Sequence, residues 1–180
     1  MSAHSLADVG PLTVLLAVVL VLAVWFDVGQ KRIPNWLTVG GMVGALVLRG
    51  VMGAGAFGTG LLGGLLGLSL GLLLFTIGAM GAGDGKLLAT VGACLGLGAF
   101  VQALPLIGLG GGLLALVVAA RARLLIPTLL RFRDLLFHIV SFGRIGERRT
   151  LAMPGAVTVP YGLAVAAGVL WAWMASGISP

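Results

Sequence analysis

The sequence predicts an all-α membrane protein of about six transmembrane helices, and three observations lead to this prediction. Hydrophobic residues make up 59% of the chain and charged residues only 9%, whereas a soluble domain carries roughly 25% charged residues. The apolar residues form runs close to the length that crosses a bilayer, about 20 residues for a helix. Most of the charged residues fall between these runs. We therefore expect one polytopic membrane domain over residues 1–180.

The candidate spans are six apolar segments joined by short connections. Met1–Gly10 contains no Lys or Arg, unlike the positive start of a signal peptide, so we expect the first segment to be retained. The fourth and fifth segments meet at Ala103-Leu104-Pro105, where we expect a tight turn between neighbouring helices. The segments are Pro11–Phe26, Trp36–Met52, Phe57–Met80, Lys86–Ala103, Leu104–Ala120 and Val157–Ala175.

The basic residues indicate how these spans are oriented. If the chain alternates across the membrane, ten of its 11 Lys and Arg residues fall on one side, and only Arg49 falls near the other. Loops rich in Lys and Arg face the cytoplasm. We therefore expect the connections after the first, third and fifth spans in the cytoplasm, and both termini outside.

The segment Arg121–Thr150 is too charged to span the membrane. From Pro127 onward, polar residues three or four apart form a stripe, which predicts an amphipathic helix at the cytoplasmic interface. Topology and anionic lipid explain the net charge of +6, so the expected partner is membrane lipid and not nucleic acid. The stripe consists of Arg131, Asp134, His138 and Ser141.

Glycine accounts for 31 residues, and part of it is spaced for helix contact. Small residues let helix backbones approach closely in lipid. We expect two glycine faces of this kind to pack against other helices. They are Gly63, Gly67 and Gly71 in the third span, and Gly40 and Gly44 in the second.

Two of the five acidic residues stand where a carboxylate is costly. Asp27 follows the first span, and Asp84 lies in Gly81-Ala82-Gly83-Asp84-Gly85-Lys86, between the third and fourth spans. A carboxylate near membrane depth usually has a function or a partner. Both fall on the expected cytoplasmic side, so they can share one polar pocket. The other acidic residues are Asp8 in the N-terminal tail, and Asp134 and Glu147 among the arginines of 121–150.

Two facing carboxylates are the minimum needed for aspartic peptide hydrolysis. One takes a proton from water, and the other, protonated, polarises the scissile carbonyl; two adjacent carboxylates cannot both ionise cheaply. Gly83 would let the backbone at Asp84 approach a substrate. From the residues alone a structural alternative stays open, in which Asp27 caps its loop or pairs with Lys31, and Asp84 caps the fourth span or pairs with Lys86. No cofactor or metal is expected, because the single cysteine and two histidines form no ligand cluster.

Three segments resemble motifs of the type IV prepilin peptidases, which are GxGD aspartyl intramembrane peptidases. Asp27 with Lys31 and Ile33-Pro34-Asn35 resembles their first motif. Gly81–Leu87, which contains Gly83, Asp84 and Lys86, resembles the second motif, Gly-x-Gly-Asp-x-Lys-Leu. Pro160-Tyr161-Gly162 resembles a third segment at the start of the last span. The resemblance covers about residues 10–175.

The resemblance implies an activity and roles for these residues. Such enzymes cut the basic leader from prepilins or pseudopilins after a glycine, at the cytoplasmic face of the bacterial inner membrane. Asp27 and Asp84 match the two catalytic aspartates. The supporting roles that follow are for Pro34 and Asn35 to shape the loop beside Asp27, for Lys86 to orient Asp84 or anchor its helix end, and for Tyr161 to line the pocket.

One departure from the larger members of this family limits the implied activity. Bifunctional members carry a cytoplasmic insert with four cysteines and also N-methylate the mature pilin. This chain has only Cys94. It resembles the short, peptidase-only members found with tight-adherence or Flp pilus systems, so no methyltransferase activity is expected. The expected partners are a prepilin or pseudopilin substrate and the pilus assembly machinery.

Two other classes of protein stay open at this point. A small transporter would use Asp27 and Asp84 to bind protons or cations; inverted repeats would favour it, and none is convincing here. A non-catalytic subunit of a pilus or secretion assembly would use the aspartates structurally. The presenilin type of peptidase also uses Gly-x-Gly-Asp, but its Pro-Ala-Leu motif is absent.

Overall fold

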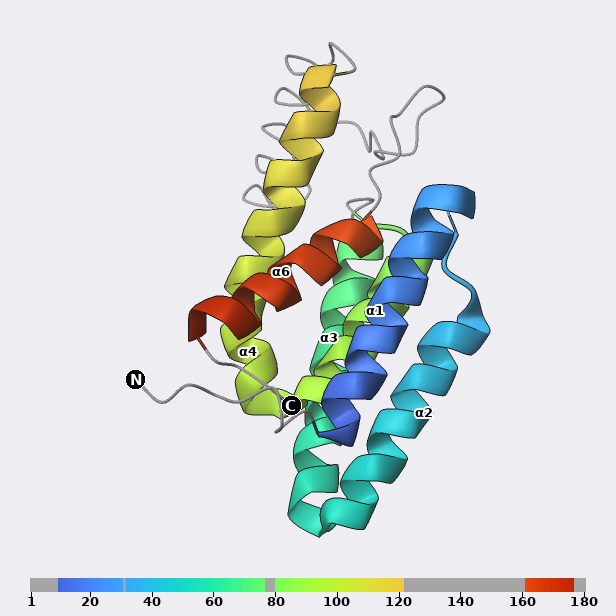
Figure 1. The fold of residues 1–180 in the computed structure, drawn as a ribbon, viewed down its shortest axis with the longest axis vertical. Helices are drawn as coiled ribbons and strands as arrows, with labels where there is room; N and C mark the ends of the chain where they lie inside the picture. The colour runs from blue at the N-terminus through green and yellow to red at the C-terminus, as the bar shows by residue number, and fades with distance from the viewer. Residues whose placement is uncertain (1–9, 31, 77–79, 122–160, 177–180) are drawn as a thin grey trace, which may run out of the picture.

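The structure, a computed structural model, describes residues 10–30, 32–76, 80–121 and 161–176. Helices account for almost all of these residues, and the described part contains no strand (Figure 1). The amphipathic helix predicted from Pro127 lies outside the described residues. The helices are α1 (Pro11–Gln30), α2 (Asn35–Met52), α3 (Ala54–Thr76), α4 (Ala82–Arg121) and α6 (Tyr161–Ser176).

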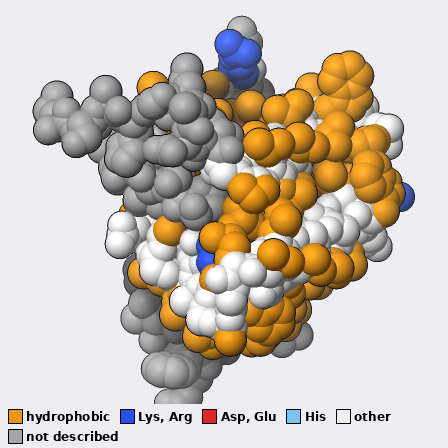
Figure 2. All heavy atoms as spheres, turned by 60° about the horizontal axis from the view of Figure 1, so that its bottom comes forward, with side chains coloured by type: hydrophobic (Ala, Val, Ile, Leu, Met, Phe, Trp, Pro, Cys, Tyr) orange, Lys and Arg blue, Asp and Glu red, His pale blue; other side chains and the backbone are white. Residues whose placement is uncertain are grey.

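Four of these helices, α1 to α4, are long and apolar enough to cross a membrane. The shorter α6 is apolar over Gly162–Met174. Large apolar side chains are exposed around the bundle, such as Val21 at 67% and Leu109 at 62%. Figure 2 shows a face covered mainly by hydrophobic side chains, with no acidic side chain visible among its coloured residues. The predicted class, an all-helical membrane protein, is therefore confirmed, while the number of spans stays a prediction.

The break in α4 corrects the predicted position of a turn. The turn expected at Ala103-Leu104-Pro105 is absent: Pro105 lies inside α4, and the helix breaks at Gly96. Gly96 has φ 76° and ψ 166°, a backbone conformation that is essentially restricted to glycine. Proline is tolerated inside membrane helices where neighbouring groups compensate for the lost hydrogen bond. The chain therefore turns at Gly96 and not at Pro105. In Figure 1 the part of α4 before the break runs beside α3, and the part after it returns toward the end where α4 began.

Arg49, on α2, supplies the donors that this break requires. A helix end leaves the carbonyls of its last turn without N–H partners. Nε of Arg49 donates to the carbonyl of Ala93 at 2.9 Å, and Nη2 donates to that of Cys94 at 2.8 Å. The arginine is only 6% exposed, and Nη1 donates to Oγ1 of Thr59 at 3.2 Å. The one basic residue outside the predicted charge asymmetry is thus part of the packed interior.

Glycine contacts join α3 to the first part of α4 with the backbones almost touching. The predicted glycine face of α3 is buried and lies directly on the α4 backbone, which confirms its packing role. A side chain at any of its positions would collide with main-chain atoms of α4. The contacts pair Gly63 with Gly92, Gly67 with Leu88 and Gly71 with Gly85, which makes the two segments antiparallel.

The predicted glycine face of α2 is confirmed only in part, because Gly44 packs on α1 but Gly40 contacts no other helix. Gly40 is exposed with nothing within 4 Å, and the nearest neighbour of Gly44 is the side chain of Leu15. The buried position is Gly41, where an added Cβ would lie 2.9 Å from both Thr90 and Val19. The inward stripe of α2 runs instead through Leu37, Gly41, Ala45 and Arg49, four residues apart.

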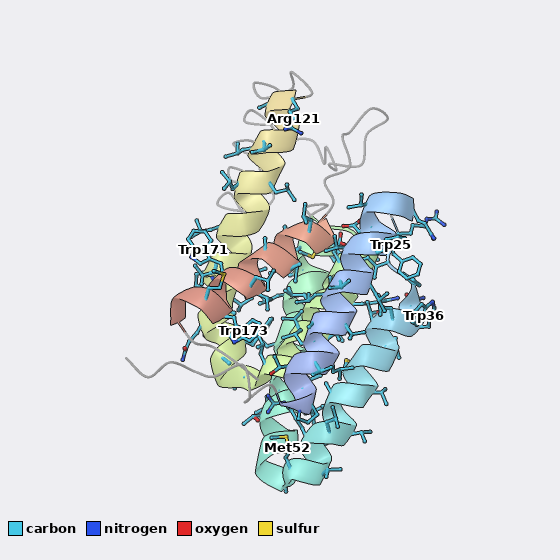
Figure 3. All side chains as sticks on the ribbon, viewed as in Figure 1. Trp25, Trp36, Met52, Arg121, Trp171 and Trp173 are labelled. Atoms are coloured by element: carbon cyan, nitrogen blue, oxygen red, sulfur yellow. The ribbon has the colours of Figure 1, made fainter. Side chains whose placement is uncertain are left out.

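One end of the bundle carries aromatic and basic residues. Trp25 is 76% exposed and Trp36 is 64% exposed, and Trp36 packs edge-to-face on Phe26 with ring centroids 5.9 Å apart. Figure 3 shows Trp25 and Arg121 toward one end of the molecule and Met52 at the other. Exposed tryptophan is typical of the membrane–water interface. The α1–α2 connection and the start of α4 lie at this tryptophan-bearing end.

Candidate active site

Asp27 lies in the last turn of α1, inside the helix rather than after it. It is 7% exposed and continues the buried stripe of α1, which runs through Leu12, Leu16, Val19, Leu20 and Ala23. These positions recur at three- and four-residue steps, so they share one helix face. The sequence therefore points this carboxylate at the other helices and away from lipid.

Asp84 lies in the first turn of α4, which begins at Ala82 rather than at Lys86 as predicted. Its Oδ2 accepts a hydrogen bond from the backbone N–H of Gly81 at 3.2 Å. An acidic side chain at the third helical position that reaches back to the residue before the helix is half of a capping box. The bond fixes one carboxylate oxygen of Asp84 against its own helix end.

Asp27 and Asp84 are brought to the same end of the bundle, because Ile33 of the connection that follows α1 packs on Gly83, next to Asp84. They are also the only acidic residues in the described part of the chain. Each uses Oδ2 to accept a backbone N–H, from Gly162 in one case and Gly81 in the other. Within the described residues, Oδ1 of each has no hydrogen-bond partner. The arrangement leaves one oxygen of each carboxylate for water or a substrate.

Two contacts hold the first motif against the second. Ile33 is buried and lies on Gly83, where an added Cβ would be 3.5 Å from that of Ile33. Asn35, the first residue of α2, accepts a hydrogen bond at Oδ1 from Nζ of Lys86 at 2.8 Å. Lys86 thus binds the neighbouring helix start, and among the described residues it forms no ion pair with Asp84. These contacts fix the start of α4 relative to the end of α1.

Asp84 stands between two glycines that both face other backbone. Gly83 faces Ile33, as described, and Gly85 faces Gly71 of α3, whose main-chain atoms would lie 3.1 Å from an added Cβ. The sequence analysis predicts a role for Gly83 but not for Gly85. The packing role of Gly85 is nevertheless predictable, because Gly71 belongs to a glycine face that requires an equally small partner on the neighbouring helix. Asp84 is therefore held by α3 as well as by the α1–α2 connection.

The third predicted segment meets the site through its backbone. Gly162, the second residue of α6, is buried, and its N–H donates to Oδ2 of Asp27 at 2.7 Å. Tyr161 is the first residue of α6, and the predicted placement of its side chain in the pocket lies outside what the structure describes. Lys31 and Pro160 also lie outside the described residues. Pro34 directly precedes α2 and is half-buried.

The described residues contain no group of three or more His, Cys, Asp or Glu side chains that could hold a metal ion. The side chain of Cys94, in α4, is buried in the core of the bundle, where it behaves as a small hydrophobic residue.

The fold and the site define a helical membrane protein with two carboxylates brought together at one end of the bundle. Residues 14–120 match the model of the type IV leader peptidase family, and the chain belongs to this family, whose members are peptidases. The matched region contains both aspartates and ends before α6. No curated protein and no solved structure matches the chain.

Proposed function

We propose that this protein is an aspartic endopeptidase that removes the leader peptide of type IV prepilins or pseudopilins. The observation that carries the proposal is the position of Asp27 and Asp84 at one end of the bundle, where the α1–α2 connection that follows Asp27 packs on Gly83, next to Asp84. Membership of the type IV leader peptidase family supports the substrate class. The two carboxylates are the proposed catalytic residues.

The proposed reaction needs one carboxylate ionised and the other protonated. The ionised group takes a proton from a water molecule, whose oxygen forms a bond to the scissile carbonyl carbon. The protonated group donates a hydrogen bond to the carbonyl oxygen and stabilises the negative charge that develops there. Close approach favours this singly protonated state, because two ionised carboxylates side by side repel each other.

Collapse of the tetrahedral intermediate completes the reaction. The C–N bond breaks, and the amine leaving group takes the proton that was removed from water. The products are the free leader, ending in a new carboxylate, and the mature pilin with a new amino terminus. The enzyme ends with one proton shared between the two aspartates, as it began.

The proposed location is the bacterial inner membrane, with the site at the cytoplasmic face. Arg32 lies in the α1–α2 connection and Lys86 near the start of α4, the two segments that carry or adjoin the aspartates. Figure 3 places Arg121 toward the same end as Trp25, whereas Arg49 is buried beside the break in α4. A concentration of Lys and Arg at one end of the bundle supports the placement of that end in the cytoplasm. The substrate would present its basic leader there while its hydrophobic helix stays in the membrane.

The proposed activity is peptide cleavage alone. A single cysteine cannot provide the cysteine set of the larger, methylating members, so no N-methylation of the product is expected. The proposed partners are the precursor pilin, membrane lipid and the pilus assembly machinery that receives the mature subunit.

Cleavage of a co-expressed small prepilin tests this function. The precursor is followed by gel mobility and by the mass of the new N-terminus, in cells carrying the wild type, Asp27→Asn or Asp84→Asn. Loss of cleavage in both variants is expected, because an amide can neither take the proton from water nor act as the acid. Ser69→Ala, at an exposed position of α3, serves as the control for membrane accumulation.

Normal processing by either aspartate variant would exclude the two-carboxylate mechanism. Failure of the wild type on several pilins, with the protein present in the membrane, would exclude the proposed substrate class. Cleavage by the wild type alone, at a bond after glycine, is the result that the proposal requires.

A further inference from the structure

We propose that Gly162, at the start of α6, is a positioning residue for catalysis: its backbone N–H sets the orientation of the Asp27 carboxylate. This inference rests on the proposed function, since it assumes that Asp27 takes part in the reaction. It starts from a contact between residues 135 positions apart, a buried hydrogen bond of 2.7 Å from the Gly162 N–H to Oδ2 of Asp27.

The bond is available because Gly162 belongs to the first turn of α6. The first N–H groups of a helix have no partner within the helix. They also carry the positive end of the helix dipole, which favours a carboxylate close by. Asp27 therefore occupies the place that a capping side chain normally takes, but it comes from another helix.

The bond acts on one oxygen of Asp27 and thereby fixes the other. A carboxylate is planar, so a donor on Oδ2 restricts rotation of the group and sets the direction of Oδ1. Asp84 is held in the same way by Gly81, through its own Oδ2. Two backbone donors thus orient the two carboxylates, and a productive geometry requires placement of reacting groups to a fraction of an ångström.

The approach of α6 to Asp27 also leaves no room for a side chain at position 162. An added Cβ would lie 2.9 Å from Oδ2 of Asp27, 3.3 Å from its Cβ and 3.4 Å from its Cγ. Alanine there must push the carboxylate away or move the helix start. In either case the hydrogen bond lengthens while Asp27 itself remains intact.

A purely structural role for Gly162 predicts a different result, and α6 contains a suitable comparison. Gly168, further along α6, is pressed on the α4 backbone at Ile107 and is also intolerant of a side chain. It makes no contact with Asp27. Gly168→Ala therefore disturbs the docking of α6 without touching the carboxylate, and Gly108→Ala, which has nothing within 4 Å, disturbs neither.

The test is steady-state cleavage of a purified prepilin by full-length enzyme in lipid nanodiscs. Wild type, Gly162→Ala, Gly168→Ala and Gly108→Ala are compared, with Asp27→Asn included. Gly162→Ala is expected to lower kcat by at least about tenfold with KM nearly unchanged, since misplacing a reacting group by about 1 Å costs on the order of 100-fold. Gly168→Ala is expected to lose thermal stability at least as much but to keep most of its kcat.

Three outcomes separate the possibilities. A kcat for Gly162→Ala equal to that of the wild type, or no lower than that of Gly168→Ala, overturns the positioning role while the two-aspartate mechanism stands. Full activity of Asp27→Asn overturns the proposed function and this inference with it. A loss of kcat confined to Gly162→Ala and Asp27→Asn supports both the positioning role of Gly162 and the proposed function.

Discussion

Arg49 of α2 and Gly96 of α4 depend on each other: the glycine breaks the helix, and the arginine binds the carbonyls that the break exposes. The fit is close, since an added Cβ at Gly96 would lie 2.9 Å from Nη2 of Arg49. The guanidinium has only uncharged partners among the described residues. The break is therefore stabilised by hydrogen bonding and packing rather than by an ion pair.

Replacing Arg49 by methionine is expected to destabilise the protein strongly. The carbonyls of Ala93 and Cys94 would lose their donors in a buried site, at a cost of about 1–3 kcal/mol for each unsatisfied group. Thermal unfolding in detergent measures the effect. Arg121→Met, at an exposed arginine, is the control, and an Arg49→Met midpoint no lower than the control's would contradict the capping role.

Gly96→Ala is expected to destabilise the protein by about 1–3 kcal/mol, because an alanine side chain strains the backbone conformation at this position. Gly98→Ala is the matched control: it lies in the same helix, with nothing within 4 Å, and should be neutral or slightly stabilising. The thermal unfolding midpoints of the two variants in detergent test this prediction. Equal midpoints would show that the helix does not require the break.

The hydrogen bond between Lys86 and Asn35 is expected to support activity through placement of Asp84. Lys86→Met and Asn35→Leu should each lower kcat/KM several-fold, since the bond contributes on the order of 1 kcal/mol. The double variant should lose no more than the worse single variant, because both changes remove the same interaction. Asn35→Asp keeps the acceptor and should retain most of the activity; additive losses in the double variant would rule out a shared role.

Gly85→Ala is expected to lower cleavage of the prepilin more than it lowers the amount of enzyme in the membrane. Its Cβ would lie 3.1 Å from the backbone of Gly71, so the first turn of α4 must shift, and Asp84 shifts with it. Gly58→Ala in α3, with nothing within 4 Å, is the control and should cleave normally. The readout is the fraction of prepilin cleaved at equal membrane levels of enzyme. Normal cleavage by Gly85→Ala would show that this contact is not needed to place the carboxylate.

Much of the site could be predicted from the sequence, because its chemistry is concentrated in unusual residues. A carboxylate in an apolar chain stands out, and Asp27 and Asp84 are the two that border the spans. The glycine face of α3 was also predictable from its four-residue spacing. These signals are local, so they can be read without knowing which helices are neighbours.

The features that escaped prediction depend on contacts between distant segments. In lipid the outer face of a helix is as apolar as its inner face, so hydropathy does not reveal which glycines of α2 face the protein. The break at Gly96 needs an arginine more than 40 residues earlier, and the bond to Asp27 comes from the backbone of Gly162. A backbone donor leaves no trace in side-chain chemistry.

The wide separation of the site's parts along the chain has a consequence for biosynthesis. Asp84 follows Asp27 by 57 residues (84 − 27), and Gly162 follows it by 135. At the usual speed of translation, 5–20 residues per second, Gly162 leaves the ribosome roughly 7–27 s after Asp27. During that interval a nascent chain holds one or both aspartates without α6. A nascent enzyme would thus lack the backbone donor that orients Asp27 until α6 has been synthesised and has docked.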